Sequence, residues 1–183
     1  MDVISHWLWG QGLTRNKISW KISGPMGVLP DLVAFIPASI VSWLSGRERV
    51  KVDDTTVTSD FPAIAWEIYK WSHSLFIVVV LFVCAYIWLQ RKGHSKEECI
   101  QTSWLFILPW LIHIIIDIPG HSINFFPTPF LHPFSDFMVN GVRWSTWWFF
   151  GLNLIGLAVL WYEVLKREKD QKIGNKQNTS EST

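Results

Sequence analysis

Three long uncharged stretches of apolar residues dominate the pattern along the chain, at residues 71–89, 100–116 and 144–162. Each approaches the roughly 20 apolar residues that a helix needs to cross a bilayer. A fourth apolar region, residues 22–46, contains charges only at Asp31, but several prolines and glycines interrupt it. The pattern therefore predicts an all-α, polytopic membrane helix bundle with three clear spans and a broken N-terminal helical region.

The N-terminal region allows two alternatives. A basic turn separates two apolar segments, residues 3–13 and 18–30, which favours a helical hairpin followed by a short interfacial helix over residues 34–45. The other alternative is one full span through residues 28–45. It would place His6 on the opposite side of the membrane from the other histidines.

Basic residues in the loops predict the orientation, because cytoplasmic loops of membrane proteins are enriched in Lys and Arg. The loop at residues 91–96 and the C-terminal tail are basic, whereas the loop at residues 119–143 holds a single basic residue, Arg143. We therefore expect a single membrane-embedded domain over residues 1–165. Residues 166–183 are predicted to form a basic, disordered cytoplasmic tail.

Composition agrees with a membrane protein. Only 17% of the 183 residues are charged, 49% are hydrophobic, and 13 are Trp, a residue that favours the membrane–water interface. This excludes a disordered, collagenous or disulfide-rich secreted chain. The net charge of +1 offers no electrostatic basis for binding nucleic acid, and nothing in the sequence fixes the oligomeric state.

Imidazoles and carboxylates gather at one predicted end of the spans. His113 and Asp117 are four residues apart, so they share one helix face, as do the paired ligands of zinc proteases. His73 lies at the outer start of another span. His121 follows a Pro-Gly bend that turns it back toward the same place. Ionisable residues in or beside spans are costly, so they point to a functional site.

Together with His6, Asp31 and Asp136, these residues offer more ligands than one tetrahedral site takes, and the set suits two metal ions. Imidazole and carboxylate without thiolate favour Zn²⁺, Mn²⁺ or Fe²⁺. Such ions lower the pKa of bound water to about 7 and polarise phosphoryl oxygens, so no Ser or Cys nucleophile is required. A site at the outer membrane surface suits a lipid or lipid-linked phosphoester.

At these residues the chain resembles the YdjM-like family of membrane-bound metal-dependent hydrolases, also described as LexA-regulated inner-membrane hydrolases. That family is distantly similar to the zinc-dependent phospholipase C and S1/P1 nuclease superfamily. The matching motifs occur in the family's order and are Ser5-His6, Leu29-Pro30-Asp31-Leu32, Ser72-His73-Ser74-Leu75, His113 to Asp117 and Pro133-Phe134-Ser135.

The resemblance implies a bacterial inner-membrane hydrolase that holds one to three divalent ions, with zinc favoured. Its substrate would be a small-molecule or lipid phosphoester, and membrane lipid would be a partner. The metal ligands carried over are His6, Asp31, His73, His113 and Asp117. His121 and Asp136 would complete the shell or act as general acid and orienting base. The chain departs from the family at Val33, where many members have Asp, and at His121, where a small or hydroxyl residue is common.

A non-catalytic metal-binding or metal-transporting membrane protein is the alternative function. A carrier should keep its ligands near the middle of the membrane, in facing spans. Here the expected ligands lie at span ends and in an outer loop, which favours a surface site and a hydrolase.

Overall fold

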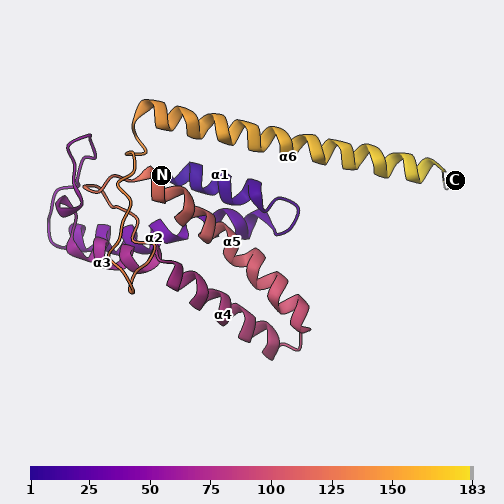
Figure 1. Cartoon of the computed structure of the whole chain (residues 1–183), viewed down its shortest axis with the longest axis horizontal. Helices are drawn as coiled ribbons and strands as arrows, with labels where there is room; N and C mark the ends of the chain where they lie inside the picture. The colour runs from indigo at the N-terminus through magenta and orange to yellow at the C-terminus, as the bar shows by residue number, and fades with distance from the viewer. Residues whose placement is uncertain (182–183) are drawn as a thin grey trace.

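The structure is a computed structural model that describes the backbone of residues 1–181 and the side chains of residues 1–174. Over these residues the chain forms six α-helices and one short 3₁₀ helix, without a β-strand, which confirms the all-α class (Figure 1). In chain order the elements are α1 (Val3–Leu13), α2 (Trp20–Leu44), η1 (Thr58–Asp60), α3 (Ala63–Ser72), α4 (Leu75–Arg91), α5 (Lys96–Gly120) and α6 (Trp147–Glu181).

Three helices are long and apolar enough to cross a membrane: α2, α5 and the Trp147–Gly174 part of α6. The bent pair of α3 and α4 is a further candidate if it is counted as one broken span. The two helices meet at 59°, because α4 starts anew at Ser74, whose hydroxyl accepts from the Ile77 amide at 3.3 Å. The bend places His73 at a junction of two helices.

The N-terminal region differs from the prediction. α2 is one continuous helix despite Pro25, Pro30 and Pro37, so the expected break and the separate interfacial helix over residues 34–45 are wrong. A proline in a helix removes one backbone hydrogen bond, but packing against neighbouring helices offsets that loss. α2 has such neighbours in α1, α3 and α5. The hairpin itself is confirmed, since α1 folds back on the first half of α2.

Small residues let α1 and α2 approach closely. A Cβ atom on Gly27 would lie 2.7 Å from the His6 carbonyl oxygen, and one on Gly10 would lie 3.0 Å from the Ser23 carbonyl oxygen. At Gly27 a side chain would force the two backbones apart, and small residues at such crossings are typical of membrane helix pairs. The contact brings the start of α1, with His6, against the middle of α2.

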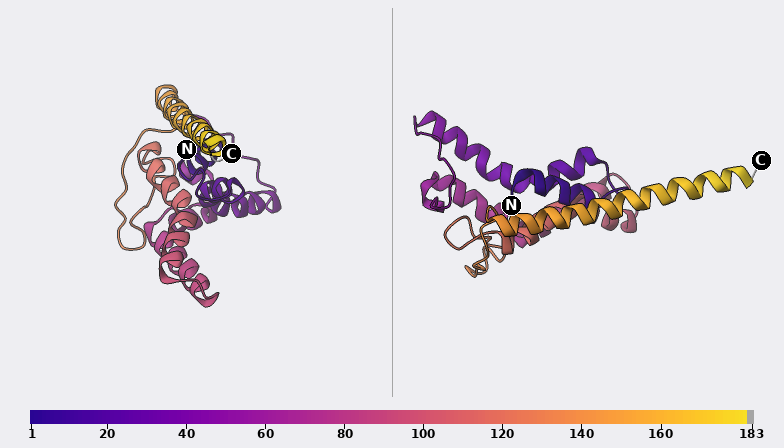
Figure 2. Two further views of the ribbon diagram at one scale, coloured as in Figure 1. Left: turned by 90° about the vertical axis from the view of Figure 1, so that its right-hand side faces the viewer. Right: turned by 90° about the horizontal axis from the view of Figure 1, so that it is seen from above.

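The C-terminal helix is longer than predicted. α6 runs to Glu181, through the tail that the composition marks as disordered, and it extends past the rest of the bundle (Figure 2). Apart from Asp170, residues 166–172 are all Lys, Arg, Glu or Gln, which favour helix. An ion pair at 2.7 Å between Arg15 Nε and Glu168 Oε1 ties the helix to the end of α1.

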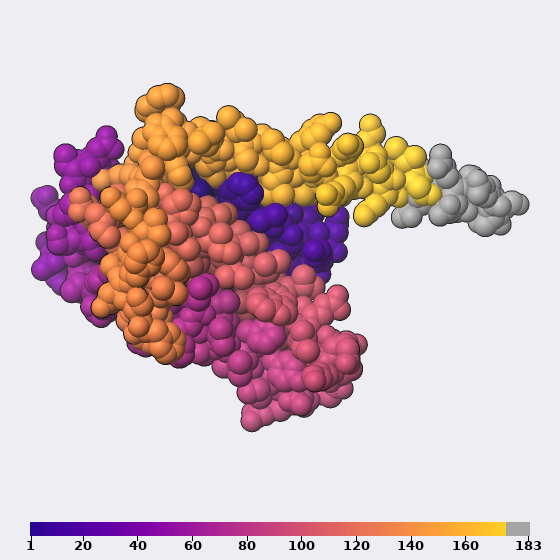
Figure 3. All heavy atoms as spheres, viewed as in Figure 1, coloured from indigo at the N-terminus to yellow at the C-terminus, as the bar shows by residue number. Residues whose placement is uncertain are grey.

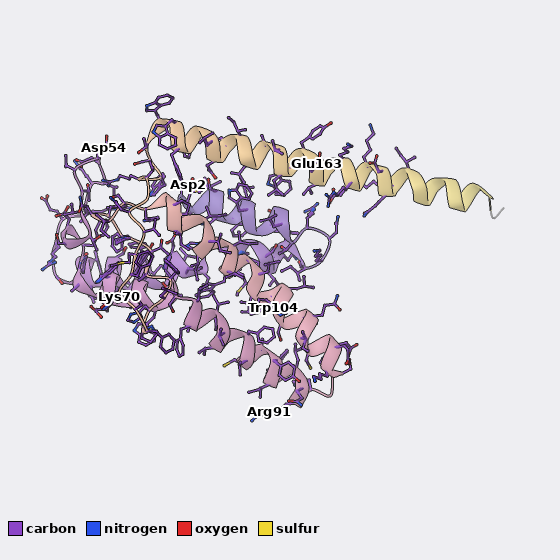
Figure 4. The ribbon with its side chains drawn as sticks, viewed as in Figure 1. Asp2, Asp54, Lys70, Arg91, Trp104 and Glu163 are labelled. Atoms are coloured by element: carbon purple, nitrogen blue, oxygen red, sulfur yellow. The ribbon has the colours of Figure 1, made fainter. Side chains whose placement is uncertain are left out.

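A layer outside the long helices, which we call the cap, consists of residues 45–62, α3 and the loop at residues 121–146. Figure 3 shows the loop, in orange, lying across the face of the molecule, and Figure 4 shows side chains crowded near Asp54 and Lys70. The loop is anchored to the end of α5, where the Val142 amide donates to the Pro119 carbonyl at 2.8 Å. The cap therefore covers the end of the bundle at which α5 ends and α6 begins (Figure 1).

Candidate metal centre

Four side chains from distant parts of the sequence meet beneath the cap. Asp31 comes from the middle of α2, His73 from the junction of α3 and α4, and His113 and Asp117 from the last two turns of α5. All four are buried, and one ligand atom from each lies within 4.8 Å of the others. This group has the composition and spacing to hold a metal ion.

The separations between the ligand atoms match those around a tetrahedral ion. Bonds of about 2.0–2.2 Å place tetrahedral ligands about 3.3–3.6 Å apart. His73 Nε2 lies 3.0 Å from His113 Nε2 and 3.4 Å from Asp31 Oδ1. Asp117 Oδ2 lies 3.3 Å from His113 Nε2 and 3.6 Å from His73 Nε2. His113 Nε2 lies 3.7 Å from Asp31 Oδ1, so these five separations are close to the tetrahedral range, and all four ligand atoms lie within 4.8 Å of one another.

Hydrogen bonds orient both imidazoles for coordination. His113 Nδ1 lies 2.7 Å from the Gly27 carbonyl oxygen, which only accepts, so Nδ1 donates and Nε2 keeps its lone pair. The Ser72 hydroxyl donates to the Tyr69 carbonyl at 3.3 Å and so accepts from His73 Nδ1 at 2.9 Å. Metal-binding histidines are held in this way in known sites. The two facing lone pairs repel each other unless a cation or a proton lies between them.

His6 and His121 adjoin this group. The His6 ring stacks on His113 with centroids 3.6 Å apart, and His6 Nε2 lies 3.1 Å from Asp117 Oδ1. His121 Nε2 lies 3.5 Å from Asp117 Oδ2. His121 Nδ1 donates to the Phe125 carbonyl at 3.2 Å. Burial lowers the pKa of His121, which favours the neutral ring.

Buried polar atoms at the centre lack partners. Asp117 Oδ2 and His6 Nδ1 have no hydrogen-bond partner among the described residues, and the 3.1 Å contact between His6 Nε2 and Asp117 Oδ1 lacks the angle of a hydrogen bond. The ammonium group of Met1 bonds to Asp117 Oδ1 at 2.5 Å and lies 3.1 Å from His121 Nε2. An unpartnered buried polar atom costs free energy, and bound cations are a common remedy. The donor set therefore fits a metal centre.

Asp136 is the predicted site residue that the structure does not bring to this centre. It is exposed in the loop at residues 121–146, beside Phe134, which is 81% exposed. It therefore does not complete the metal shell or orient a base there. Arg143, the loop's basic residue, donates to the carbonyl oxygens of Asp54 and Thr56 and so braces the cap. His94 is exposed in the turn between α4 and α5, at the opposite end of α5 from the cluster.

Sequence reasoning missed the groups that orient the ligands. Ser72 precedes His73 directly, so its hydroxyl could have been noticed beside the motif. The Gly27 carbonyl has no side-chain signature, and only the fold reveals its role. Tyr69 stacks on the His73 ring with centroids 3.6 Å apart.

Comparisons with known proteins add no relative. No protein-family model, curated protein or solved structure matches the chain. The membrane-type helices and the buried cluster are therefore features of the structure alone.

Proposed function

We propose that this protein is a membrane-bound, metal-dependent hydrolase that cleaves a phosphoester. The convergence of Asp31, His73, His113 and Asp117 on one buried point carries the proposal. The order of the motifs, which resembles that of the YdjM-like hydrolases, supports the reaction type. A divalent ion, Zn²⁺ or else Mn²⁺ or Fe²⁺, suits imidazole and carboxylate ligands without thiolate.

The residues of the chain prepare the site for such an ion. When bound, the ion polarises a phosphoryl oxygen and activates water for attack. Asp31 and Asp117 supply negative charge that offsets the charge of the ion. Tyr69 and Phe126 are almost fully buried beside the cluster and restrict the entry of water. Electrostatic interactions at such a sheltered site are stronger than in water.

The position of the cluster favours a substrate held at the membrane surface. His6, His73 and the His113–Asp117 pair lie near helix ends, at the end of the bundle that the cap covers. Trp147 and Trp148, at the start of α6, are exposed, as is typical of an interfacial belt. A lipid or lipid-linked phosphoester would reach such a site from the membrane.

Activity in purified protein tests the proposal. We expect the full chain in detergent to hydrolyse a generic phosphodiester or a phospholipid, to stop after chelation, and to resume with Zn²⁺ or Mn²⁺. The variant His113→Ala should be inactive, whereas His94→Ala, at an exposed position, should match the wild type. Turnover that survives both chelation and His113→Ala would contradict the proposal.

We also propose that the protein lies in a bacterial inner membrane with a cytoplasmic C-terminus. In a background without cysteine, a membrane-impermeant maleimide should label Phe134→Cys in intact spheroplasts. It should label Lys172→Cys only after lysis. Both positions are exposed in the folded chain. The reverse labelling pattern would overturn the orientation.

A non-catalytic metal carrier is the second candidate. One observation favours it: Asp31 lies in the middle of α2, a candidate span, as carrier ligands do. Uptake of Zn²⁺ or Mn²⁺ into proteoliposomes that contain the chain, together with no phosphodiester turnover, would select this function. The His113→Ala variant should then show no uptake.

A further inference from the structure

We propose that a groove along the second half of α2 binds an anionic phospholipid, whose phosphate contacts Arg47 and Arg49. This α2 groove consists of a cavity of about 500 Å³ and a neighbouring one of about 350 Å³, and Phe35, Ser39 and Trp43 line both. Ligand sites in proteins typically have volumes of about 300–1,000 Å³. None of the four residues of the candidate metal centre lines either cavity. The inference therefore goes beyond the proposed function and does not depend on it.

The way in which α2 ends determines where the two arginines lie. Gly46 has a φ of +64°, and its amide donates to the Trp43 carbonyl at 3.2 Å. The Arg47 amide donates to the Ser42 carbonyl at 3.0 Å. These are the two bonds of a Schellman motif, which ends a helix with a residue in the left-handed conformation, most often glycine. The chain leaves α2 at this turn, and Arg47 and Arg49 then line the larger cavity.

The arginines make this end of the groove positive. Neither side chain forms an ion pair among the residues that the structure describes. Glu48 lies between them in the sequence, but it is exposed and does not line the larger cavity. The Asp53 carboxylate accepts from the Thr55 and Thr56 amides at 2.8 and 3.0 Å. Since guanidinium groups bind phosphate oxygens in pairs, this end of the groove fits a phosphate group.

The rest of the groove is apolar and belongs to a candidate membrane span. Ile36, Ile40 and Trp43 line the smaller cavity, and each is more than half exposed. From Ile36 to Leu44 the helix rises about 12 Å, close to the roughly 15 Å of hydrocarbon in one leaflet. The arginines follow the end of this helix, at the level that lipid headgroups occupy. A phospholipid fills both parts of the groove, whereas a free phosphate would leave the apolar part empty.

A lipid in the α2 groove would also pack against the wall of the metal centre. Phe35 lines both cavities, and its ring centroid lies 6.1 Å from that of Tyr69. Tyr69 in turn stacks on the His73 ring, with centroids 3.6 Å apart. A ligand that binds only the folded chain stabilises it. We therefore expect the lipid to support the fold around the centre rather than to be consumed there.

Native mass spectrometry of the full chain in a neutral detergent tests the headgroup. Phosphatidylglycerol should bind about tenfold more tightly than phosphatidylcholine with the same acyl chains, because the choline cation is repelled by the two arginines. The variant Arg47→Gln/Arg49→Gln should lose this preference. Arg91→Gln/Lys92→Gln is the matched control, since it removes the same two charges at the exposed end of α4 and should bind as the wild type does. Equal binding of both lipids by the wild type, or equal loss in both variants, would overturn the proposal.

A second set of measurements tests the apolar part of the groove. Ser39→Trp, at an exposed position that lines both cavities, should fill the groove and weaken the binding of phosphatidylglycerol about tenfold. Glycerol phosphate, which lacks acyl chains, should not displace the lipid. Displacement by glycerol phosphate, or wild-type affinity in Ser39→Trp, would overturn a lipid site.

Two further readouts need no substitution. Phosphatidylglycerol, but not phosphatidylcholine, should raise the thermal midpoint of the wild type in detergent. Its affinity should be the same with added Zn²⁺ and with a chelator, because the groove does not include the metal ligands. Affinity that disappears with the chelator would place the lipid at the metal centre and overturn the groove, while leaving the proposed function standing. Loss of turnover with unchanged lipid affinity would do the reverse.

Discussion

Replacing Asp117 by Ala should weaken metal binding more than about 100-fold. The side chain lies within 3.6 Å of four imidazoles, those of His6, His73, His113 and His121, so its loss affects every part of the centre. Removing a group that only orients a ligand costs about 10–100-fold in affinity, and a shared ligand should cost more. Competition with a chelating dye, on protein in detergent, measures the change.

Matched variants separate coordination from packing. Asp117→Asn keeps the shape of the side chain and removes its charge, so it should also lose most of the affinity. Ser72→Ala removes the acceptor for His73 Nδ1 and should cost only about 10–100-fold. His94→Ala should leave affinity unchanged. Wild-type affinity in Asp117→Asn would show that the carboxylate does not bind metal.

Helix periodicity explains what the sequence revealed about the centre. His113 and Asp117 are four apart in an uncharged stretch, so their common face followed from the geometry of a helix. His73 was expected at the start of a span, and the structure places it at the junction that precedes α4. In both cases the information is local, and a short segment of sequence contains it.

Tertiary contacts decided the parts that the sequence left open. Three prolines predict a broken helix, yet α2 is continuous because it packs against α1, α3 and α5. The continuous helix fixes the position of Asp31 beside the other ligands and brings the Gly27 carbonyl to His113. A backbone carbonyl has no identity in a sequence, so its role could not have been predicted.

The loop at residues 121–146 shows the same limit. The loop lacks any periodic pattern, so the sequence alone could not tell which of His121 and Asp136 lies at the metal centre. His121 directly follows α5 and is held near Asp117 by the end of that helix. Asp136 lies farther along the loop, where the chain has turned outward to solvent. Closeness to the end of α5 therefore explains why His121, and not Asp136, lies at the metal centre.

Replacing Gly27 by Val should destabilise the fold and disturb the metal centre together. A Cβ atom there would lie 2.7 Å from the His6 carbonyl oxygen, a backbone atom that a rotamer change cannot move. Overpacking of this kind costs about 1–3 kcal/mol. For a chain of this length that corresponds to a fall of roughly 2–12 °C in the thermal midpoint. Thermal unfolding in detergent, followed by circular dichroism, measures it.

The metal affinity of the same variant is a second measurement, because Gly27 positions both His6 and His113. Separating α1 from α2 moves His6, and shifting the Gly27 carbonyl removes the acceptor that orients His113. Affinity should therefore fall even at temperatures where the helices remain folded. Gly151→Ala is the control, since a Cβ atom on that helical glycine meets nothing within 4 Å. It should match the wild type or gain up to about 1 kcal/mol in stability. Equal midpoints and equal affinities for Gly27→Val and Gly151→Ala would mean that the crossing of α1 and α2 does not position the centre.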